Sequence, residues 1–194
     1  MINEIDYPFT LAKIKDLKIG AAVKLSGLVF TGRDRLHKHL FEGGKCPVNL
    51  KDGAIFHAGP LVMCREGVWI MQAIGPTTSM RHDLYMPKII AQHHVRVIIG
   101  KGGMGKETQK TCAKYGCVYL QAVGGVASLL ASKIEKVAGV HFIKEFGTTE
   151  ALWELILRNF EAIVTIDVHG RSLHKKVETT SKRVLKKMLQ KNPF

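Results

Sequence analysis

GPTTSMR at residues 75–81 directly follows the apolar run VWIMQAI at residues 68–74, and GKGG at residues 100–103 directly follows VRVII at residues 95–99. Each pair predicts a buried strand that ends in a loop carrying small residues, hydroxyl groups and a cation. Open α/β sheets bind their ligands at such strand ends. Free backbone N–H groups beside two threonines, an arginine and a lysine are suited to hold an anion. The sequence therefore predicts an anion site where these two loops meet.

Length and hydropathy set the class of protein. The chain of 194 residues fits a single domain over 1–194, large enough to bury a core. Hydrophobic residues make up 46% of the chain, and the mean hydropathy is +0.04, as in soluble globular proteins. No apolar run approaches the roughly 20 residues of a membrane helix. The N-terminal residues MINEID lack the basic and apolar regions of a signal peptide, which predicts a cytoplasmic protein.

The residues that most often bind metals show no metal-binding spacing. The four cysteines form neither a CxxC pair nor a zinc-finger pattern, and we interpret them as buried reduced thiols: Cys46, Cys64, Cys112 and Cys117. Five histidines are interpreted as satisfied or exposed imidazoles: His37, His57, His82, His93 and His94. We therefore predict no metal site on this chain.

The net charge of +13 is unevenly distributed. Residues 171–194 hold eight Lys and Arg residues against the single acid Glu178, a net +7 that leaves +6 for the first 170 residues. We predict a basic C-terminal helix at about 171–190. Such a helix can bind nucleic acid or an acidic partner. A solvated helix face with a partial apolar stripe is the commoner origin of this pattern, and excess lysine also attracts small dianions.

Periodicity predicts a mixed α/β chain with a strand-rich first half. There we expect strands at 22–30, 54–57 and 68–74, a turn at Gly59-Pro60, and a helix at about 80–93 that Pro87 limits or kinks. The second half is expected to alternate, with strands at 95–99, 117–122, 141–146 and 162–168 and helices at 106–115, 126–137 and 149–160. This pattern favours β-layers covered by helices over a plain doubly wound sheet.

The loop at 100–103 is compatible with two other chemistries. GKGGMGK at 100–106 has the spacing of a nucleotide phosphate loop, but Glu107 stands where that motif needs a hydroxyl for magnesium. Nucleotide hydrolysis is therefore not expected. IIGKGG at 98–103 also resembles the GXXG signature of KH domains, which bind RNA. A KH loop joins two helices, whereas 95–99 is β-branched and predicts a strand. RNA binding by a KH-like or otherwise basic module through Gly100–Gly103 remains the alternative function.

Further segments occur in a fixed order around these two loops. They are TGRD at 31–34 with His37, AGP at 58–60, GPTTSxRxD at 75–83, IGKGG at 99–103, YLxAVGG at 119–125 and AIVxID at 162–167. The ordered set closely resembles the β subunit, or C-terminal region, of class I fumarate hydratases and L(+)-tartrate dehydratases, over about residues 6–176. Two features depart from the family pattern: Met80 stands where a small residue is common, and the tail beyond about residue 176 lies outside it.

The resemblance implies the architecture and the activity. It implies a three-layer β/β/α swivelling-type domain in the β subunit of a hydro-lyase. The reaction would be reversible hydration of a C4 dicarboxylate, with fumarate/malate first and L-tartrate/oxaloacetate next. A four-iron, four-sulfur cluster would be held by cysteines of a separate α subunit and not by this chain. The enzyme would be active only with that subunit, as an α2β2 hetero-oligomer without a membrane or nucleic-acid partner.

The resemblance also assigns roles to individual residues. It puts Arg33, Arg81 and Lys101 on the substrate carboxylates, Thr78 in the same pocket, and Thr77 at the proton transfer, so that Thr77 and Lys101 are the catalytic pair. A dicarboxylate needs two or more cations converging on one cleft, and arginine grips a carboxylate through two parallel bonds. A threonine hydroxyl is a poor base alone, so an acidic group, expected from the α subunit, would have to take its proton.

Each of these residues also has a simpler explanation. Arg33 beside Asp34 fits a surface ion pair worth under about 1 kcal/mol. Thr77 and Thr78 fit the start of a helix as capping residues, and Lys101 fits a solvated loop. The convergence of three cations at three predicted strand-to-helix junctions favours the functional interpretation.

Overall fold

The structure is a computed structural model that describes residues 2–191. Its strands are β1 (Asn3–Asp6), β2 (Ala22–Thr31), β3 (Ala54–Phe56), β4 (Ala58–Arg65), β5 (Val68–Pro76), β6 (Val97–Gly100), β7 (Val118–Gln121), β8 (Ile134–His141) and β9 (Leu152–Ile166). Its helices are α1 (Leu11–Ile14), α2 (Asp34–Phe41), the 3-10 turn η1 (Ser79–His82), α3 (Met86–His93), α4 (Lys106–Tyr115), α5 (Ala127–Ala131), α6 (Ile143–Phe146) and α7 (Leu173–Lys191). Within the described range, none of the helices combines the length and the apolar character needed to cross a membrane.

Seven strands form one sheet in the order β1-β2-β3-β6-β7-β9-β8, and β4 pairs with β5 in a separate hairpin. Because β2 pairs with β3 and also with β9, the strands β2, β3, β6, β7 and β9 close into a ring. β3, β6 and β7 run parallel to one another, whereas β9 runs antiparallel to β2, β7 and β8. β9, with 15 residues, is long enough to pair with β2 and β8 along its first part and with β7 at 163–166.

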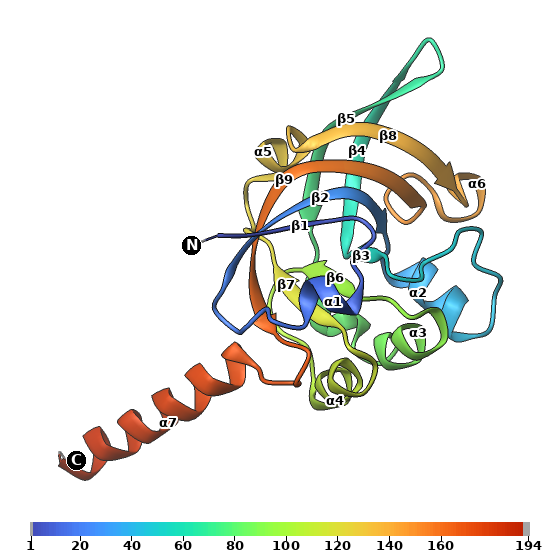
Figure 1. The fold of residues 1–194 in the computed structure, drawn as a ribbon. Coiled ribbons are helices and arrows are strands. Elements are labelled where there is room, and N and C mark those ends of the chain that lie inside the picture. The colour runs from blue at the N-terminus through green and yellow to red at the C-terminus, as the bar shows by residue number, and fades with distance from the viewer. Residues whose placement is uncertain (1, 192–194) are drawn as a thin grey trace.

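The elements stack in layers (Figure 1). The long curved strands β2, β8 and β9 and the β4–β5 hairpin lie on one side, the short parallel strands β3, β6 and β7 lie in the middle, and α2, α3 and α4 cover the other side. The α/β class expected from the sequence is confirmed, and the layers run β, β, α. The basic helix α7 projects away from this body.

The core lies on both faces of the parallel strands. Val97 and Ile99 of β6 belong to a buried cluster that includes Trp153 of β9, while Ile98 between them belongs to a second cluster with Ile89 of α3. The aliphatic side chains among them are all fully buried: Ile89, Val97, Ile98 and Ile99. A strand that is apolar on both faces is typical of the interior of a parallel sheet. The apolar run before the glycine stretch at 100–103 is therefore a buried strand, as predicted.

Three predictions for the second half of the chain are wrong. The helix predicted at 126–137 is the shorter α5 followed by β8, the strand predicted at 141–146 contains α6, and the helix predicted at 149–160 is the first part of β9. Leucine and glutamate in β9 favour a helix by intrinsic propensity. However, burial alternates between neighbouring residues along much of β9, and pairing with β2 and β8 stabilises the strand.

Three details of the first half also differ from the prediction. Gly59-Pro60 is not a turn but belongs to β4, which pairs with β5 over its full length. β5 is a strand as expected, yet its outer end is not buried, since the side chain of Val68 is 64% exposed. The helix expected at about 80–93 begins only at Met86, because Pro87 in the first turn starts a helix and cannot continue one.

Candidate active site

The loops that follow β5 and β6 lie side by side and are joined through their backbones. Lys101 N–H donates to Thr77 O over 3.2 Å, and Ser79 N–H donates to Lys101 O over 2.9 Å. Thr78 and Lys101 form an isolated parallel bridge. A third segment joins them at the end of β3, where His57 O accepts a hydrogen bond from Thr77 N–H at 2.7 Å. The two glycine stretches quoted first are thus one structural unit.

This unit forms the floor of an open recess of about 430 Å³. Nine residues line the recess: Arg33, Gly59, Gly75, Pro76, Thr77, Thr78, Arg81, Lys101 and Gly125. All five site residues predicted from the sequence are among them. They come from the β2–α2 junction, the loop after β5, η1 and the loop after β6, so the fold brings together side chains from distant segments. Their individual roles stay predictions.

The three cations of the recess differ in their surroundings. Arg33 is largely buried and lies against Gly59, with its Nε 3.3 Å from Glu150 Oε1. Arg81 is about half exposed and forms an ion pair with Asp34 of α2. Lys101 has no ion-pair partner among the described residues, and its stem lies against Gly124. Lys101 is therefore the cation most available to a ligand.

The carboxylates near the recess are already engaged. Glu150 Oε2 accepts a hydrogen bond from Arg35 N–H at 2.9 Å, and its other oxygen faces Arg33. Asp34 faces Arg81. The described lining of the recess itself contains arginine and lysine but no aspartate or glutamate. An anionic ligand with two negative charges would therefore meet an excess of positive charge, and Thr77 has no carboxylate of this chain lining the recess beside it.

The loop after β6 does not have the context of a nucleotide or KH site. Asp83 Oδ1 accepts hydrogen bonds from Gly105 N–H and Thr108 Oγ1, both at 2.7 Å, and so caps the start of α4. In a phosphate loop the N-terminus of the following helix faces the nucleotide phosphates, whereas here the Asp83 carboxylate occupies the N-terminus of α4. The loop also joins a strand to a helix, β6 to α4, whereas a KH loop joins two helices. Neither observation supports the RNA-binding alternative.

Three histidines beneath the recess contradict the interpretation drawn from the sequence. His37, His57 and His82 are fully buried, and each has at least one ring nitrogen that has no hydrogen-bond partner within residues 2–191. Burial, with the neighbouring His82, lowers the pKa of His37 to about 3. Burial, with the charges of Arg81 and Arg33, lowers the pKa of His82 to about 4. Burial likewise holds the pKa of His57 well below its usual value. Their sequence spacing gives no sign of this cluster.

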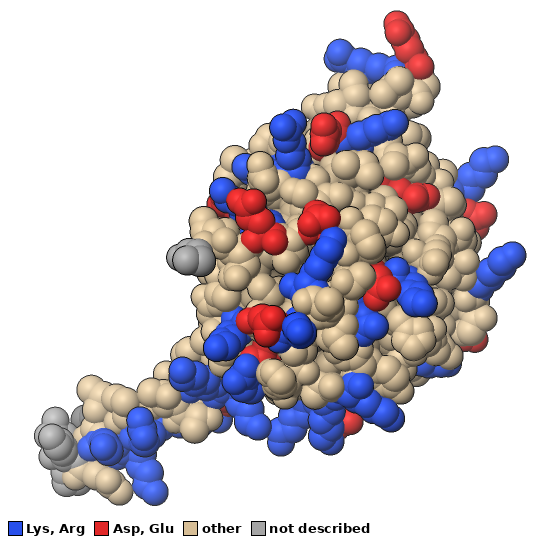
Figure 2. All heavy atoms as spheres, viewed as in Figure 1, with Lys and Arg blue, Asp and Glu red and all other residues tan. Residues whose placement is uncertain are grey.

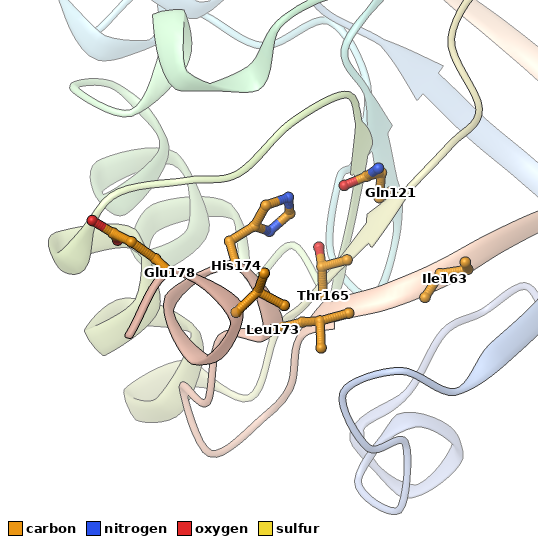
Figure 3. Close-up of a pocket in the computed structure, with 7 residues that line it drawn as sticks. Gln121, Ile163, Thr165, Leu173, His174 and Glu178 are labelled. Carbon is orange, nitrogen blue, oxygen red and sulfur yellow. The ribbon is translucent and has the colours of Figure 1, made fainter. Parts of the chain in front are cut away.

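A second pocket, of about 390 Å³, lies where α7 leaves the body. Figure 3 shows Gln121 and Thr165 on one side and Leu173 and His174 of α7 on the other. Figure 2 shows Lys and Arg side chains along the projecting α7. The hydroxyl of Thr165 is buried there and has no hydrogen-bond partner among the described residues. The lining contains no lysine or arginine, so the convergent cations belong to the first recess.

Comparison with known proteins is consistent with this geometry. A family model described as Fumarase C-terminus matches residues 2–177. A Geobacillus stearothermophilus protein provisionally named fumarate hydratase class I is 43% identical over 175 residues, which cover 90% of this chain and 34% of that protein. A Methanocaldococcus jannaschii protein provisionally named L(+)-tartrate dehydratase subunit beta is 40% identical over 192 residues, covering 95% of this chain and 97% of the relative. The L(+)-tartrate dehydratase subunit beta of Escherichia coli K12 is 37% identical over 168 residues, covering 86% and 83%. This chain thus spans about a third of the first relative and most of the other two.

Proposed function

Because the chain belongs to the Fumarase C-terminus family, we propose that it is the β subunit of a hydro-lyase that reversibly hydrates a C4 dicarboxylate. Fumarate and malate are the first substrate pair, and L-tartrate and oxaloacetate are the second. The observation that carries the proposal is the convergence of Arg33, Arg81 and Lys101 on one recess with no acid in its described lining. These three cations attract a substrate with two carboxylates, with Lys101 free of an ion pair among the described residues and each arginine shared with a neighbouring acid, Glu150 or Asp34.

The residues of this chain bind and orient the substrate. Arg33 and Arg81 present planar guanidinium groups, each able to hold one carboxylate through two parallel bonds. Removal of a proton next to a carboxylate spreads negative charge onto that carboxylate. Cations fixed around it, Lys101 among them, therefore stabilise the transition state more than the ground state.

Thr77 is the proposed proton-transfer residue. Its backbone is held on two sides, by His57 O and by Lys101 N–H, so the hydroxyl is carried on a fixed segment of the recess. Thr78 lines the same recess beside it. A hydroxyl needs an acidic partner to act as a base. Since Asp34 and Glu150 are engaged with arginines, we propose that the partner subunit supplies that acid.

We further propose that a four-iron, four-sulfur cluster belongs to the partner α subunit. The residues of this chain do not fit such a cluster. Cys112 and Cys117 are buried, Cys64 is exposed on β4, and within residues 2–191 no group of three or more His, Cys, Asp or Glu side chains is arranged to hold a metal. Four free cysteines suit a reducing compartment, so a cytoplasmic α2β2 assembly is part of the proposal.

The test is anaerobic co-expression of the tagged chain with a candidate α subunit, the larger cysteine-bearing protein proposed to hold the cluster. We expect an iron-containing complex that hydrates fumarate or dehydrates malate or L-tartrate, while this chain alone is inactive. A complex that forms, contains iron and acts on none of these dicarboxylates would overturn the substrate class. RNA bound by the lone chain and released by salt would favour the KH-like alternative instead.

A further inference from the structure

Three imidazole rings from three segments pack against one another directly beneath the recess. His37 comes from α2, His57 follows β3, and His82 ends η1. The rings of His37 and His82 are stacked with centroids 4.5 Å apart, and the His57 ring meets them edge-on at 4.9 and 4.6 Å. All three side chains have no exposed surface.

Each of the three histidines is linked, directly or through one other residue, to a residue that lines the recess. His37 Nδ1–H donates to Arg33 O over 2.6 Å, which fixes His37 as the tautomer that carries its proton on Nδ1. His57 lies at hydrogen-bond distance, 2.9 Å, from Ser79 Oγ through its Nδ1, while its backbone carbonyl holds Thr77. His82 Nδ1 lies 3.4 Å from Asp34 Oδ1, and Asp34 pairs with Arg81. The cluster thus contacts the backbone of Arg33 and lies next to Asp34, the ion-pair partner of Arg81.

Two glycines allow the backbone to lie close to the His37 and His57 rings. A Cβ at Gly32 would lie 2.9 Å from His37 Cε1. A Cβ at Gly100 would collide with Ser79 Oγ and would lie 3.1 Å from Tyr119 Oη and 3.3 Å from His57 Nδ1. The Tyr119 hydroxyl donates to Ser79 Oγ over 2.9 Å, which extends the contacts to β7. The rings and the strand ends are therefore packed as one body.

Packing alone does not explain the choice of histidine. His37 Nε2 and His57 Nε2 are buried and have no hydrogen-bond partners in the described part of the chain. Buried polar atoms without partners destabilise a fold. Leucine or phenylalanine would fill the same space without that penalty. Unlike an apolar side chain, histidine has a hydrogen-bond donor or acceptor at the edge of its ring. At His37 this donor contacts the backbone carbonyl oxygen of Arg33.

We propose that His37, His57 and His82 are positioning residues that fix Arg33, Thr77 and Arg81 relative to one another, so that the cations of the recess are prearranged for the dicarboxylate. The inference rests on the proposed function. Prearranged charges need no reorganisation when the substrate binds or when charge develops in the transition state. The three rings touch no lining surface of the recess themselves, so they act through the residues that they hold.

The test compares His37→Leu with His37→Asn. His37→Leu removes the side-chain donor to Arg33 O and leaves the backbone N–H of residue 37, which also donates to Arg33 O over 2.9 Å, whereas the amide nitrogen of His37→Asn keeps a side-chain donor near the same place. Thr165→Val is the matched control, because it also removes a buried polar group but lies at the α7 pocket. All are measured in the assembled complex, with malonate as a non-reacting dicarboxylate probe. We expect His37→Leu to weaken malonate binding and to lower kcat/KM by at least about tenfold. His37→Asn should recover most of both, and Thr165→Val should leave both unchanged.

Several outcomes would overturn the inference. One is a folded His37→Leu complex with wild-type malonate affinity and kcat/KM. Another is an equal loss in His37→Leu and His37→Asn that follows their loss of thermal stability, which would indicate a structural role only. If His37→Leu does not fold, imidazole ¹⁵N shifts of the wild-type chain decide: a neutral ring with its proton on Nδ1 is expected for His37, and the other tautomer would contradict the contact.

Failure of the proposed function is distinguishable from failure of this inference. A wild-type complex that binds malonate but turns over no C4 dicarboxylate would overturn the substrate or reaction, and the His37 variants would still report on positioning through malonate binding. A wild-type complex that neither binds malonate nor reacts would overturn both, because the recess would then not be a site for dicarboxylates.

Discussion

Lys101 N–H donates a hydrogen bond to the carbonyl oxygen of Thr77 over 3.2 Å, so the proposed proton-transfer residue and the most available cation share one backbone contact. The two residues are 24 positions apart in the sequence and follow different strands, β5 and β6. Their relative position depends on the sheet, because each loop begins where a strand ends. A change in either side chain can therefore be made without breaking the contact that joins the loops.

Substitution Lys101→Ala should lower kcat/KM of the assembled enzyme by at least about tenfold, the scale of one lost charge-assisted hydrogen bond. The loss should appear in kcat as well as in KM, since Lys101 is proposed to stabilise charge that develops in the transition state. Lys110→Ala is the control, because Lys110 is 71% exposed on α4 and pairs only with Glu107. Unchanged steady-state kinetics in the Lys101 variant would remove this lysine from the site.

Substitution Asp83→Ala should destabilise the chain by about 1–2 kcal/mol, the usual effect of losing the side chain that caps a helix. Asp83 Oδ1 accepts from both Gly105 N–H and Thr108 Oγ1, and the alanine would leave both donors without this partner. Urea unfolding measures the difference. Glu107 lies in the first turn of α4, but it is exposed and pairs with Lys110. Glu107→Ala should therefore change the free energy of unfolding by much less. A loss equal to that of Asp83→Ala would show that the capping contacts do not matter.

The site was more predictable from the sequence than the fold around it. Arg33, Thr77, Thr78, Arg81 and Lys101 all line one recess, because they stand at the ends of strands or the starts of helices, where sequence signals are strong. The resemblance to a family assigned their roles, which composition and spacing alone do not give. The α/β class followed from the expected alternation of strands and helices. One of those strands was expected at 95–99, and the structure has β6 at Val97–Gly100, buried on both faces.

β9 and the histidine cluster were not predictable in the same way. β9 contains leucine and glutamate that favour a helix locally, and only its pairing with β2, β7 and β8 makes it a strand. His37, His57 and His82 are 20 and 25 residues apart along the chain, and no local pattern links them. Their contacts arise from the packing of α2, β3 and η1, which is information on long-range contacts that a single sequence does not display.

The buried histidines predict that acid destabilises the fold. In the unfolded chain a histidine has a pKa of about 6.5, whereas burial lowers the pKa of His37 to about 3 and that of His82 to about 4 in the folded chain. Stability is therefore fully present above pH 6.5 and falls as the pH drops toward 4, because only the unfolded chain takes up these protons. Between pH 6.5 and pH 4, each of these two rings should lower the free energy of unfolding by about 1 kcal/mol for each pH unit of acidification.

Urea unfolding between pH 7.5 and 5 measures this slope. The groups that face the rings are Arg33 and Arg81, which oppose protonation, Asp34, which favours it at His82, and the neutral hydroxyls of Ser79 and Tyr119. His82→Leu should flatten the slope, while the exposed His169→Gln should leave it unchanged. Stability that stays constant from pH 7 to pH 5 would contradict neutral burial of the cluster.

The projecting helix α7 should be the least stable regular element of the isolated chain. Its root lies beside β9, where Leu173 and Val177 line the same pocket as Ile163 and Thr165. Its outer turns expose large apolar side chains: Val184 48%, Leu185 56%, Met188 64% and Leu189 54%. Isolated helices of up to about 12–15 residues are marginal in water, and the part of α7 beyond its root is of about that length. In hydrogen exchange we expect amides at 180–190 to exchange close to the rate of an unfolded peptide, and those of Val97–Gly100 to be strongly protected. Slow exchange throughout α7 in the dilute isolated chain would show that the helix is stable without packing.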